Sequence, residues 1–171
     1  MKISPRFQKN PKVGRPVKFG FKFPEGFIVI IDTREQAPLF IERPPKGLVM
    51  VRDYLEVGDY SVRGFEKGGI TIERKMVPDL LNCLGNDRER FKRELEKIKG
   101  YEWGAIVVEG TETDLYQYHD FSLMEPESVR QSVASIEIRY HIPFYFGRTR
   151  EDIERWVLDR LIKFWRVKRE S

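Results

Sequence analysis

The chain has 171 residues, of which 40% are hydrophobic and 13% aromatic, and it carries a formal net charge of +4. This length and apolar content are enough for one good hydrophobic core, so we expect one globular domain. A single cysteine, Cys83, excludes an intramolecular disulfide, and no apolar run approaches the length of a membrane-spanning helix. These features exclude the disulfide-rich secreted and membrane-spanning classes. They predict an intracellular protein in a reducing compartment.

Positive charge is concentrated in the first 26 residues. These hold seven lysines or arginines against one acid, Glu25, a net charge of +6, so the rest of the chain carries −2. Four prolines interrupt the segment and exclude a continuous helix. We predict a basic, proline-containing arm over residues 1–26, followed by a globular domain over residues 27–171. The arm either reaches for phosphate groups, or is a solubilising tail, or is pinned to the core by its phenylalanines.

Apolar runs alternate with breaks in a way that predicts both strands and helices. Strands are predicted at residues 27–31, 48–52, 60–63, 70–75, 105–109 and 143–146, and helices at 78–84, at 87–99, from 126 and after 149. Residues 105–109 form a continuous apolar run, which is typical of a buried parallel strand, whereas residues 60–75 read as a hairpin. We therefore predict an α/β fold with a central mixed β-sheet flanked by helices.

Three polar groups adjoin these predicted strands, and they read Asp32-Thr33-Arg34-Glu35, Gly58-Asp59 and Glu73-Arg74-Lys75. In an extended strand Glu73 and Lys75 point to the same side. Thirteen residues separate Asp59 from Glu73, which is enough for a hairpin that turns at Gly68-Gly69. Taken singly, each group is typical of a solvated turn or an ion-paired strand end. Together they supply the groups that metal-assisted hydrolysis requires.

The order Asp, spacer, Glu-x-Lys is the active-site pattern of the PD-(D/E)XK nucleases. The fuller pattern resembles the XPF-type structure-specific endonucleases, the ERCC4-domain family, whose hallmark reads GD, a spacer, ERK, three residues and D. Asp59, Glu73-Arg74-Lys75 and Asp79 match it without a gap, and Asp32, Arg34 and Glu35 match the upstream DxRE element of that family. The resemblance covers roughly residues 27–168. It implies a restriction-endonuclease-like core.

The resemblance also implies where a metal ion would bind. Asp59 and Glu73 would be its direct ligands, together with a backbone carbonyl near Arg74. Oxygen ligands without soft ones favour Mg²⁺ or Mn²⁺ as the cofactor. Lys75 would orient the attacking water, so Asp59, Glu73 and Lys75 are expected to be catalytic.

Residues of the upstream element are expected to complete the site. Asp32 and Glu35 would hold the attacking water or a second ion and are also expected to be catalytic. Arg34 would stabilise these carboxylates or the phosphate, and Asp79 would orient Lys75 from the following helix, or Arg74.

Arginines crowd the first half of the predicted helix at residues 87–99. We expect Arg88 and Arg90 to contact DNA phosphates. The alternative is a solvated helix face whose arginines pair with Glu89, Glu94 and Glu96.

The expected activity is hydrolysis of phosphodiester bonds in DNA, with branched, flap or fork structures as the substrates that the resemblance implies. We expect the protein in the cytoplasm, nucleoid or nucleus. The sequence shows no helix-hairpin-helix module, so substrate choice is expected to come from the arm, from dimerisation or from a separate partner. Two alternatives stay open: a non-catalytic, nuclease-like scaffold subunit that binds DNA, and a mobile-element PD-(D/E)XK nuclease that cuts duplex DNA.

The last predicted helix carries more apolar residues than one buried face needs. They stand at positions 153, 156, 157, 158, 161, 162, 164, 165 and 167. Since Trp156, Phe164 and Trp165 are residue types that dominate interface cores, we predict a homodimer through the C-terminal third. The alternative is a helix that is buried on two sides within one chain.

Overall fold

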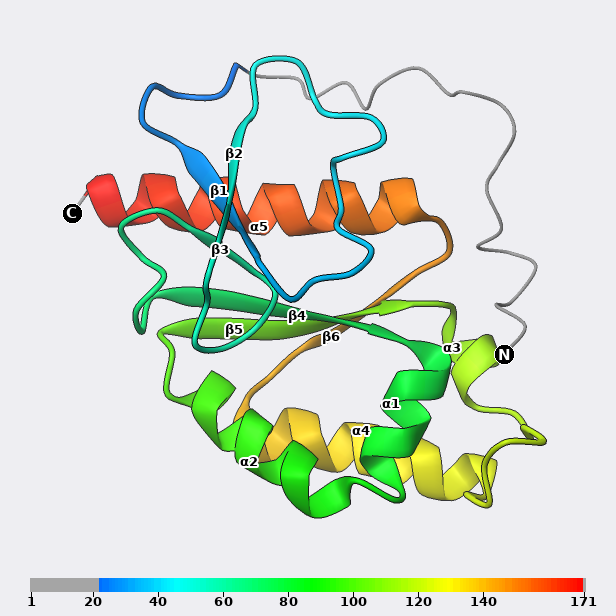
Figure 1. The fold of residues 1–171 in the computed structure, drawn as a ribbon. Helices are drawn as coiled ribbons and strands as arrows, with labels where there is room; N and C mark the ends of the chain where they lie inside the picture. Colours follow the sequence, from blue (N-terminus) through cyan, green and yellow to red (C-terminus); the bar gives the residue numbers. More distant parts are fainter. Residues whose placement is uncertain (1–21, 171) are drawn as a thin grey trace.

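Six strands form one mixed sheet in the order β2-β1-β3-β4-β5-β6 (Figure 1). The computed structural model describes residues 22–170. The strands are β1 (Ile28–Asp32), β2 (Val49–Asp53), β3 (Tyr60–Val62), β4 (Ile70–Met76), β5 (Trp103–Glu109) and β6 (Phe144–Gly147). Strand β3 is antiparallel to β1 and β4, while the β1–β2, β4–β5 and β5–β6 pairs are parallel. The predicted α/β fold with a mixed sheet is confirmed.

Helices cover both faces of this sheet. One face carries α1 (Val77–Leu84), α2 (Arg88–Lys99) and α4 (Pro126–Tyr140), and the other carries α5 (Arg150–Arg169) (Figure 1). Each face has its own hydrophobic core. Strand β5 contributes to both, because Ile106 and Val108 pack on the first face and Val107 packs beneath α5, as the alternation of a strand requires.

Local signals begin these helices as the sequence predicts. Thr149 caps α5: its hydroxyl accepts a hydrogen bond from the Asp152 backbone N–H, and the Asp152 carboxylate accepts one from the Thr149 N–H. Pro126 opens α4, where its missing N–H costs nothing. The short helix α3 (Glu112–Leu115) was not predicted, because four residues are too few to show a helical period.

The apolar band of α5 is largely buried within this chain. Its main stripe, which ends at Trp165, packs against the sheet. Trp156 is half-buried against Trp103 and Tyr145, and Phe164 packs edge-on against Phe65. Val167, at 46% exposure, is the most exposed apolar residue of the helix. The intrachain alternative therefore accounts for most of the band, and the homodimer stays a prediction.

The predicted N-terminal arm lies almost wholly outside the described residues, and its role stays a prediction. Within the described part, Phe23 stacks on Phe27 at a centroid distance of 6.0 Å and packs on the core between the sheet and α5. Of the helices in residues 22–170, none is long and apolar enough to cross a membrane.

Candidate active site

The backbone of Asp59 joins the three polar groups that the sequence singled out. Its N–H donates to the Ile72 carbonyl over 2.9 Å, and its carbonyl accepts from the Asp32 N–H over 2.8 Å. Gly58 makes this approach possible, since its φ is +78° and a Cβ there would lie 2.0 Å from Thr71 Oγ1. Only glycine therefore fits at position 58, and this close approach places Asp59 beside Ile72 and Arg74 in β4.

The Asp59 carboxylate forms no ion pair in the described part of the chain, although the charges of Arg74 and Arg34 act on it. Its one hydrogen bond there comes from the Arg74 backbone N–H to Oδ2, at 2.8 Å. Burial and the neighbouring charge of Glu73 raise the pKa of Asp59 to about 8. Burial also raises the pKa of Glu73, although the Lys75 ammonium opposes that shift. Two carboxylates, of which only Glu73 forms an ion pair, thus lie close together in a largely buried site.

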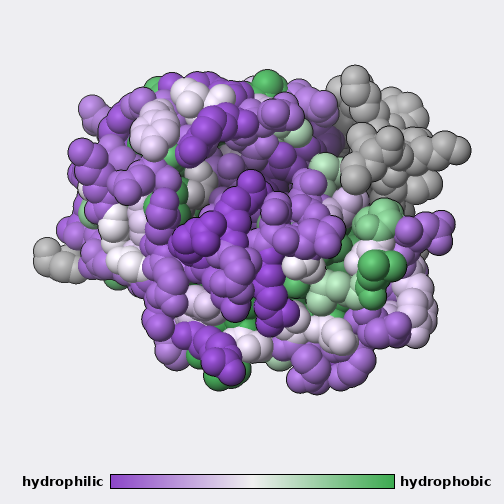
Figure 2. All heavy atoms as spheres, turned by 60° about the horizontal axis from the view of Figure 1, so that its bottom comes forward, coloured by the Kyte–Doolittle hydropathy of each residue, from purple (hydrophilic) through white to green (hydrophobic). Residues whose placement is uncertain are grey.

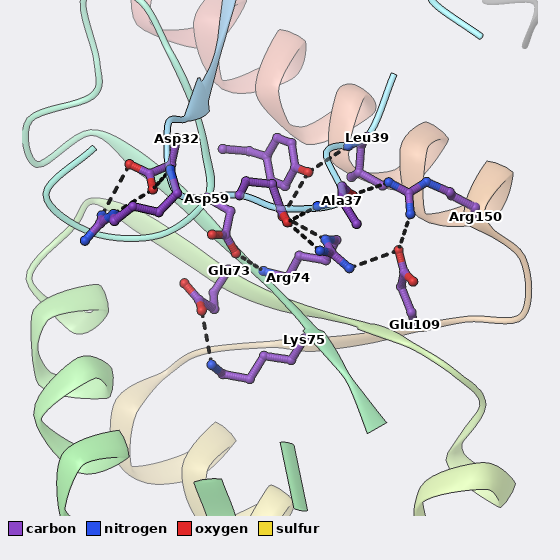
Figure 3. Close-up of polar contacts among 12 residues, drawn as sticks. Asp32, Ala37, Leu39, Asp59, Glu73, Arg74, Lys75, Glu109 and Arg150 are labelled. Atoms are coloured by element: carbon purple, nitrogen blue, oxygen red, sulfur yellow. Dashed lines mark hydrogen bonds and ion pairs between the residues drawn. The ribbon is translucent and has the colours of Figure 1, made fainter. Parts of the chain in front are cut away.

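Lys75 lies on the same face of β4 as Glu73, as the alternation predicts. Its Nζ is 3.1 Å from Glu73 Oε1 and 3.8 Å from Glu94 Oε2, and it stands 5.3 Å above the centre of the Phe91 ring. Burial alone would lower the pKa of this ammonium, but the charges of Glu73 and its other neighbours, with the hydrogen bond to Glu73, together outweigh burial and the pKa is raised. Lys75 is therefore an anchored cation next to the two carboxylates (Figure 3).

Arg74 points to the opposite face of β4, beneath α5. Its Nε donates to Glu35 Oε2 over 2.8 Å and its Nη2 donates to Oε1 of the same carboxylate. Glu35 also accepts hydrogen bonds from the Tyr60 hydroxyl and the Ala37 N–H, each at 3.1 Å. Burial would raise the pKa of Glu35, but the Arg74 guanidinium outweighs it and the pKa is lowered. The remaining guanidinium nitrogen of Arg74, Nη1, lies 3.2 Å from Glu109 Oε1.

Asp32 is fixed in a similar way at the end of β1. Its carboxylate accepts from Arg34 Nε and from the Leu55 N–H, both at 2.8 Å. Burial would raise the pKa of Asp32, yet these hydrogen bonds outweigh it and the pKa is lowered. The Arg34 side chain is 60% exposed, whereas the Asp32 side chain that it binds is buried.

Comparison with known protein families gives a match to the ERCC4 domain over residues 31–159. The chain belongs to the ERCC4-domain family. This match contains the DxRE, GD and ERK groups, and it ends within α5. No curated protein shows a significant sequence match.

Solved structures that share the fold of this ERCC4 domain include two of XPF from Aeropyrum pernix. The first, a complex with DNA, is 22% identical with a TM-score of 0.62, over 85% of this chain and 68% of that one. The second is 22% identical with a TM-score of 0.61, over 80% of this chain and 60% of that one. At this identity the likeness shows the fold.

Not every predicted residue of the ERCC4 domain lies where its expected role requires. Asp79 is exposed on α1 and forms no hydrogen bond or ion pair with Lys75 or Arg74, so it orients neither side chain in this structure; Glu94 contacts Lys75 instead. The Asp32 and Glu35 carboxylates are each held by several donors. Their predicted part in holding water or a second ion is therefore not visible in their contacts and stays a prediction.

The two arginines predicted to meet DNA lie at the start of α2. Both are exposed, and Arg90 forms ion pairs with Asp87 and Glu94. Arg88 lines a groove of about 420 Å³ between α2 and α4, together with Lys92 and Arg139. Figure 2 shows this side of the molecule, which is largely hydrophilic. The DNA contact itself stays a prediction.

Some residues around the site were missed by the sequence analysis. Glu109 follows a buried apolar run much as Asp32 does, so the same signal could have found it. Tyr60 and Glu94 carried no comparable signal, because their contacts join elements that are distant along the chain. Arg150 is of the same kind, since its partner Glu109 is 41 residues away.

The ligand set of this ERCC4 domain fits an oxygen-binding divalent ion. No three His, Cys, Asp or Glu side chains within residues 22–170 converge on a ready-made metal site. Asp59 and Glu73 would therefore need main-chain oxygen and water to complete the coordination. Mg²⁺ is commonly held in this way, by one or two carboxylates with several waters retained.

Proposed function

We propose that this chain is a divalent-metal-dependent endodeoxyribonuclease that hydrolyses phosphodiester bonds in branched DNA. The observation that carries the proposal is the pair Asp59 and Glu73, two partly buried carboxylates beside one anchored lysine. In the described structure Asp59 forms no ion pair, and its one hydrogen bond comes from a backbone N–H. Such a pair would repel an anionic phosphodiester unless a cation lay between them.

Each residue of the cluster has a distinct part in this proposal. Asp59 and Glu73 would hold Mg²⁺ or Mn²⁺, with the Arg74 carbonyl as a further ligand. When bound, the ion would offset the charge that develops at phosphorus and make water more acidic. Lys75 would donate hydrogen bonds to the attacking water or to a phosphate oxygen from its position beside Glu73. Glu35 and Asp32 would hold the end of β1 and strand β4 in place around this site.

The phosphate backbone would be held by the basic surface next to the cluster. Arg88 reaches the groove between α2 and α4, and Phe91 of the same helix lies under Lys75. Phosphate contacts of this kind position DNA without reading its sequence, which suits a nuclease that selects DNA by structure. A preference for flap or fork structures is in keeping with family membership. The same proposal places the protein with the cellular DNA and gives it a role in DNA repair.

A cleavage assay would test the proposal. Wild-type protein is incubated with flap, fork, splayed-arm and plain duplex DNA, with Mg²⁺, Mn²⁺ or excess EDTA. We expect cleavage of branched substrates only when a divalent ion is present, and none by Asp59→Asn. Glu89→Gln is the matched control, because Glu89 is an exposed carboxylate paired with Lys92. Its cleavage rate should equal that of the wild type.

Two outcomes would point to the other functions. If the protein binds branched DNA but cuts none under any metal condition, it is a scaffold subunit. If it cuts plain duplex as fast as branched DNA, or at one sequence, it is a duplex-cutting PD-(D/E)XK nuclease.

A further inference from the structure

The first turn of α5 reaches the active-site strand through a closed ring of polar contacts (Figure 3). Arg150 Nη1 lies 3.1 Å from Glu109 Oε1, and Glu109 Oε1 lies 3.2 Å from Arg74 Nη1. Arg74 in turn binds Glu35, whose Oε1 accepts the Ala37 N–H. Arg150 Nη2 closes the ring by donating to the Ala37 carbonyl. The ring thus joins α5, the end of β5, strand β4 and the loop after β1.

Charge within the ring is balanced only when Arg150 is counted. The side chains of Glu35, Glu109 and Arg74 are 4%, 5% and 8% exposed. Two buried carboxylates therefore share one buried guanidinium, and an unpaired charge in such a place is strongly unfavourable. Arg150, at 28% exposure, supplies the second positive charge.

Arg74 treats its two carboxylates differently. It binds Glu35 through Nε and Nη2 with good hydrogen-bond geometry. Its Nη1 is buried and forms no hydrogen bond, although Glu109 is near. Arg74 thus forms hydrogen bonds with Glu35, whereas its contact with Glu109 is an ion pair without a hydrogen bond. Without Arg150, Glu109 would have only Arg74 to neutralise it and would compete with Glu35 for that guanidinium.

The orientation of Arg74 matters to the proposed chemistry because of its place in β4. Its backbone N–H holds Asp59, and Glu73 and Lys75 are its chain neighbours. We propose that Arg150 is a positioning residue: by neutralising Glu109 it keeps Arg74 on Glu35 and so fixes the strand that presents Asp59 and Glu73. This inference rests on the proposed nuclease function.

A double-mutant cycle separates this role from simple packing. Arg150→Ala is expected to lower the turnover of branched DNA about tenfold with little change in KM. Glu109 would then compete with Glu35 for Arg74, and residues in one ion-pair network couple strongly. Glu109→Gln removes the competing charge, so it should restore the Arg150→Ala variant to within about threefold of the wild type. Arg150→Lys, which keeps the charge, should also retain most activity. Arg148→Ala is the matched control, since Arg148 is exposed two residues earlier.

Amide hydrogen exchange of the metal-free protein gives a second readout that needs no cleavage. Exchange of the Arg74 backbone N–H should be faster in Arg150→Ala and return toward wild type in the double variant. If the double variant is as impaired as Arg150→Ala in both turnover and exchange, Arg150 acts only through packing and the inference fails. If the wild type shows no nuclease activity, the proposed function fails, while exchange still decides whether Arg150 positions Arg74.

Discussion

The Arg74 backbone N–H donates a hydrogen bond of 2.8 Å to Asp59 Oδ2, while the Arg74 side chain lies on the opposite face of the sheet with Glu35. One residue thus links the acidic cluster on one side of β4 to the buried ion pairs on the other. Glu73 and Lys75 alternate with Arg74 and lie with the cluster. The three adjacent residues of the ERK group therefore have two separate tasks.

Replacing either cluster carboxylate by its amide should abolish cleavage and leave the fold intact. In Asp59→Asn and Glu73→Gln the amide oxygen still accepts a hydrogen bond, but the charge that would hold the cation is lost. We expect a fall of about 10²-fold or more in cleavage rate, with DNA binding unchanged. Mg²⁺ should raise the melting temperature of the wild type but not that of either variant. Near wild-type cleavage by either variant in saturating Mg²⁺ would remove that residue from the metal site.

Loss of the Lys75 ammonium should impair chemistry without removing the metal site. Lys75→Ala is expected to reduce the cleavage rate by about 10²-fold, because one preorganised donor to the reacting groups is lost. Calorimetric titration should still detect Mn²⁺ or Mg²⁺ binding, since Asp59 and Glu73 remain. Glu94→Gln, which removes only the more distant partner of Lys75, should have a much smaller effect. A Lys75 variant that binds no metal at all would show that Lys75 instead holds Glu73 in place.

Glu154 should make the protein less stable as pH rises. This carboxylate is buried on α5, where it accepts the Phe40 N–H over 2.8 Å, and burial raises its pKa above the ordinary 4.5 despite the nearby charges of Arg150 and Arg43. Between pH 4.5 and the raised pKa, the folded state binds more protons than the unfolded state, so stability is lost as pH rises through this window.

Glu154→Gln should remove this pH dependence. The amide oxygen keeps an acceptor for Phe40, so the variant should have a higher free energy of unfolding than the wild type at pH 8 and a similar one at pH 4. Urea unfolding at the two pH values measures the difference. A variant that is less stable than the wild type at pH 8 would show that the carboxylate is held by charge.

The basic arm should contribute to DNA affinity through its salt dependence. Deleting residues 1–22 removes all seven basic residues of the arm and spares Phe23, which packs on the core. Each phosphate contact that is lost should lower the slope of log affinity against log salt by roughly 0.9 for duplex DNA. A full-length variant with the seven residues changed to glutamine is the control for chain length. An unchanged slope in both proteins would identify the segment as a tail.

The homodimer prediction can be tested at the outer edge of α5. Trp103, Phe164 and Val167 line a groove of about 510 Å³ there. Sedimentation equilibrium at micromolar concentration should give twice the chain mass of 20.3 kDa, and Val167→Asp should weaken the association. A mass of one chain at every concentration would leave α5 as an intrachain core helix.

The local sequence pattern alone determined which residues form the acidic cluster. Alternation in β4 put Glu73 and Lys75 on one face, and a hairpin over residues 60–76 was enough to bring Asp59 beside them. These are short-range consequences of strand geometry, so they can be read from the residues themselves. The order of strands and helices along the chain could be predicted for the same reason.

Only the tertiary structure decided which charges pair. Glu35, Arg74, Glu109 and Arg150 come from four elements, and nothing in their spacing indicates that they form one ring. The second partner of Lys75 is likewise set by packing, because α2 brings Glu94 near while Asp79 faces solvent. Ion pairs between distant elements depend on how helices dock on the sheet, and that docking is determined by the whole apolar core rather than by the charged residues.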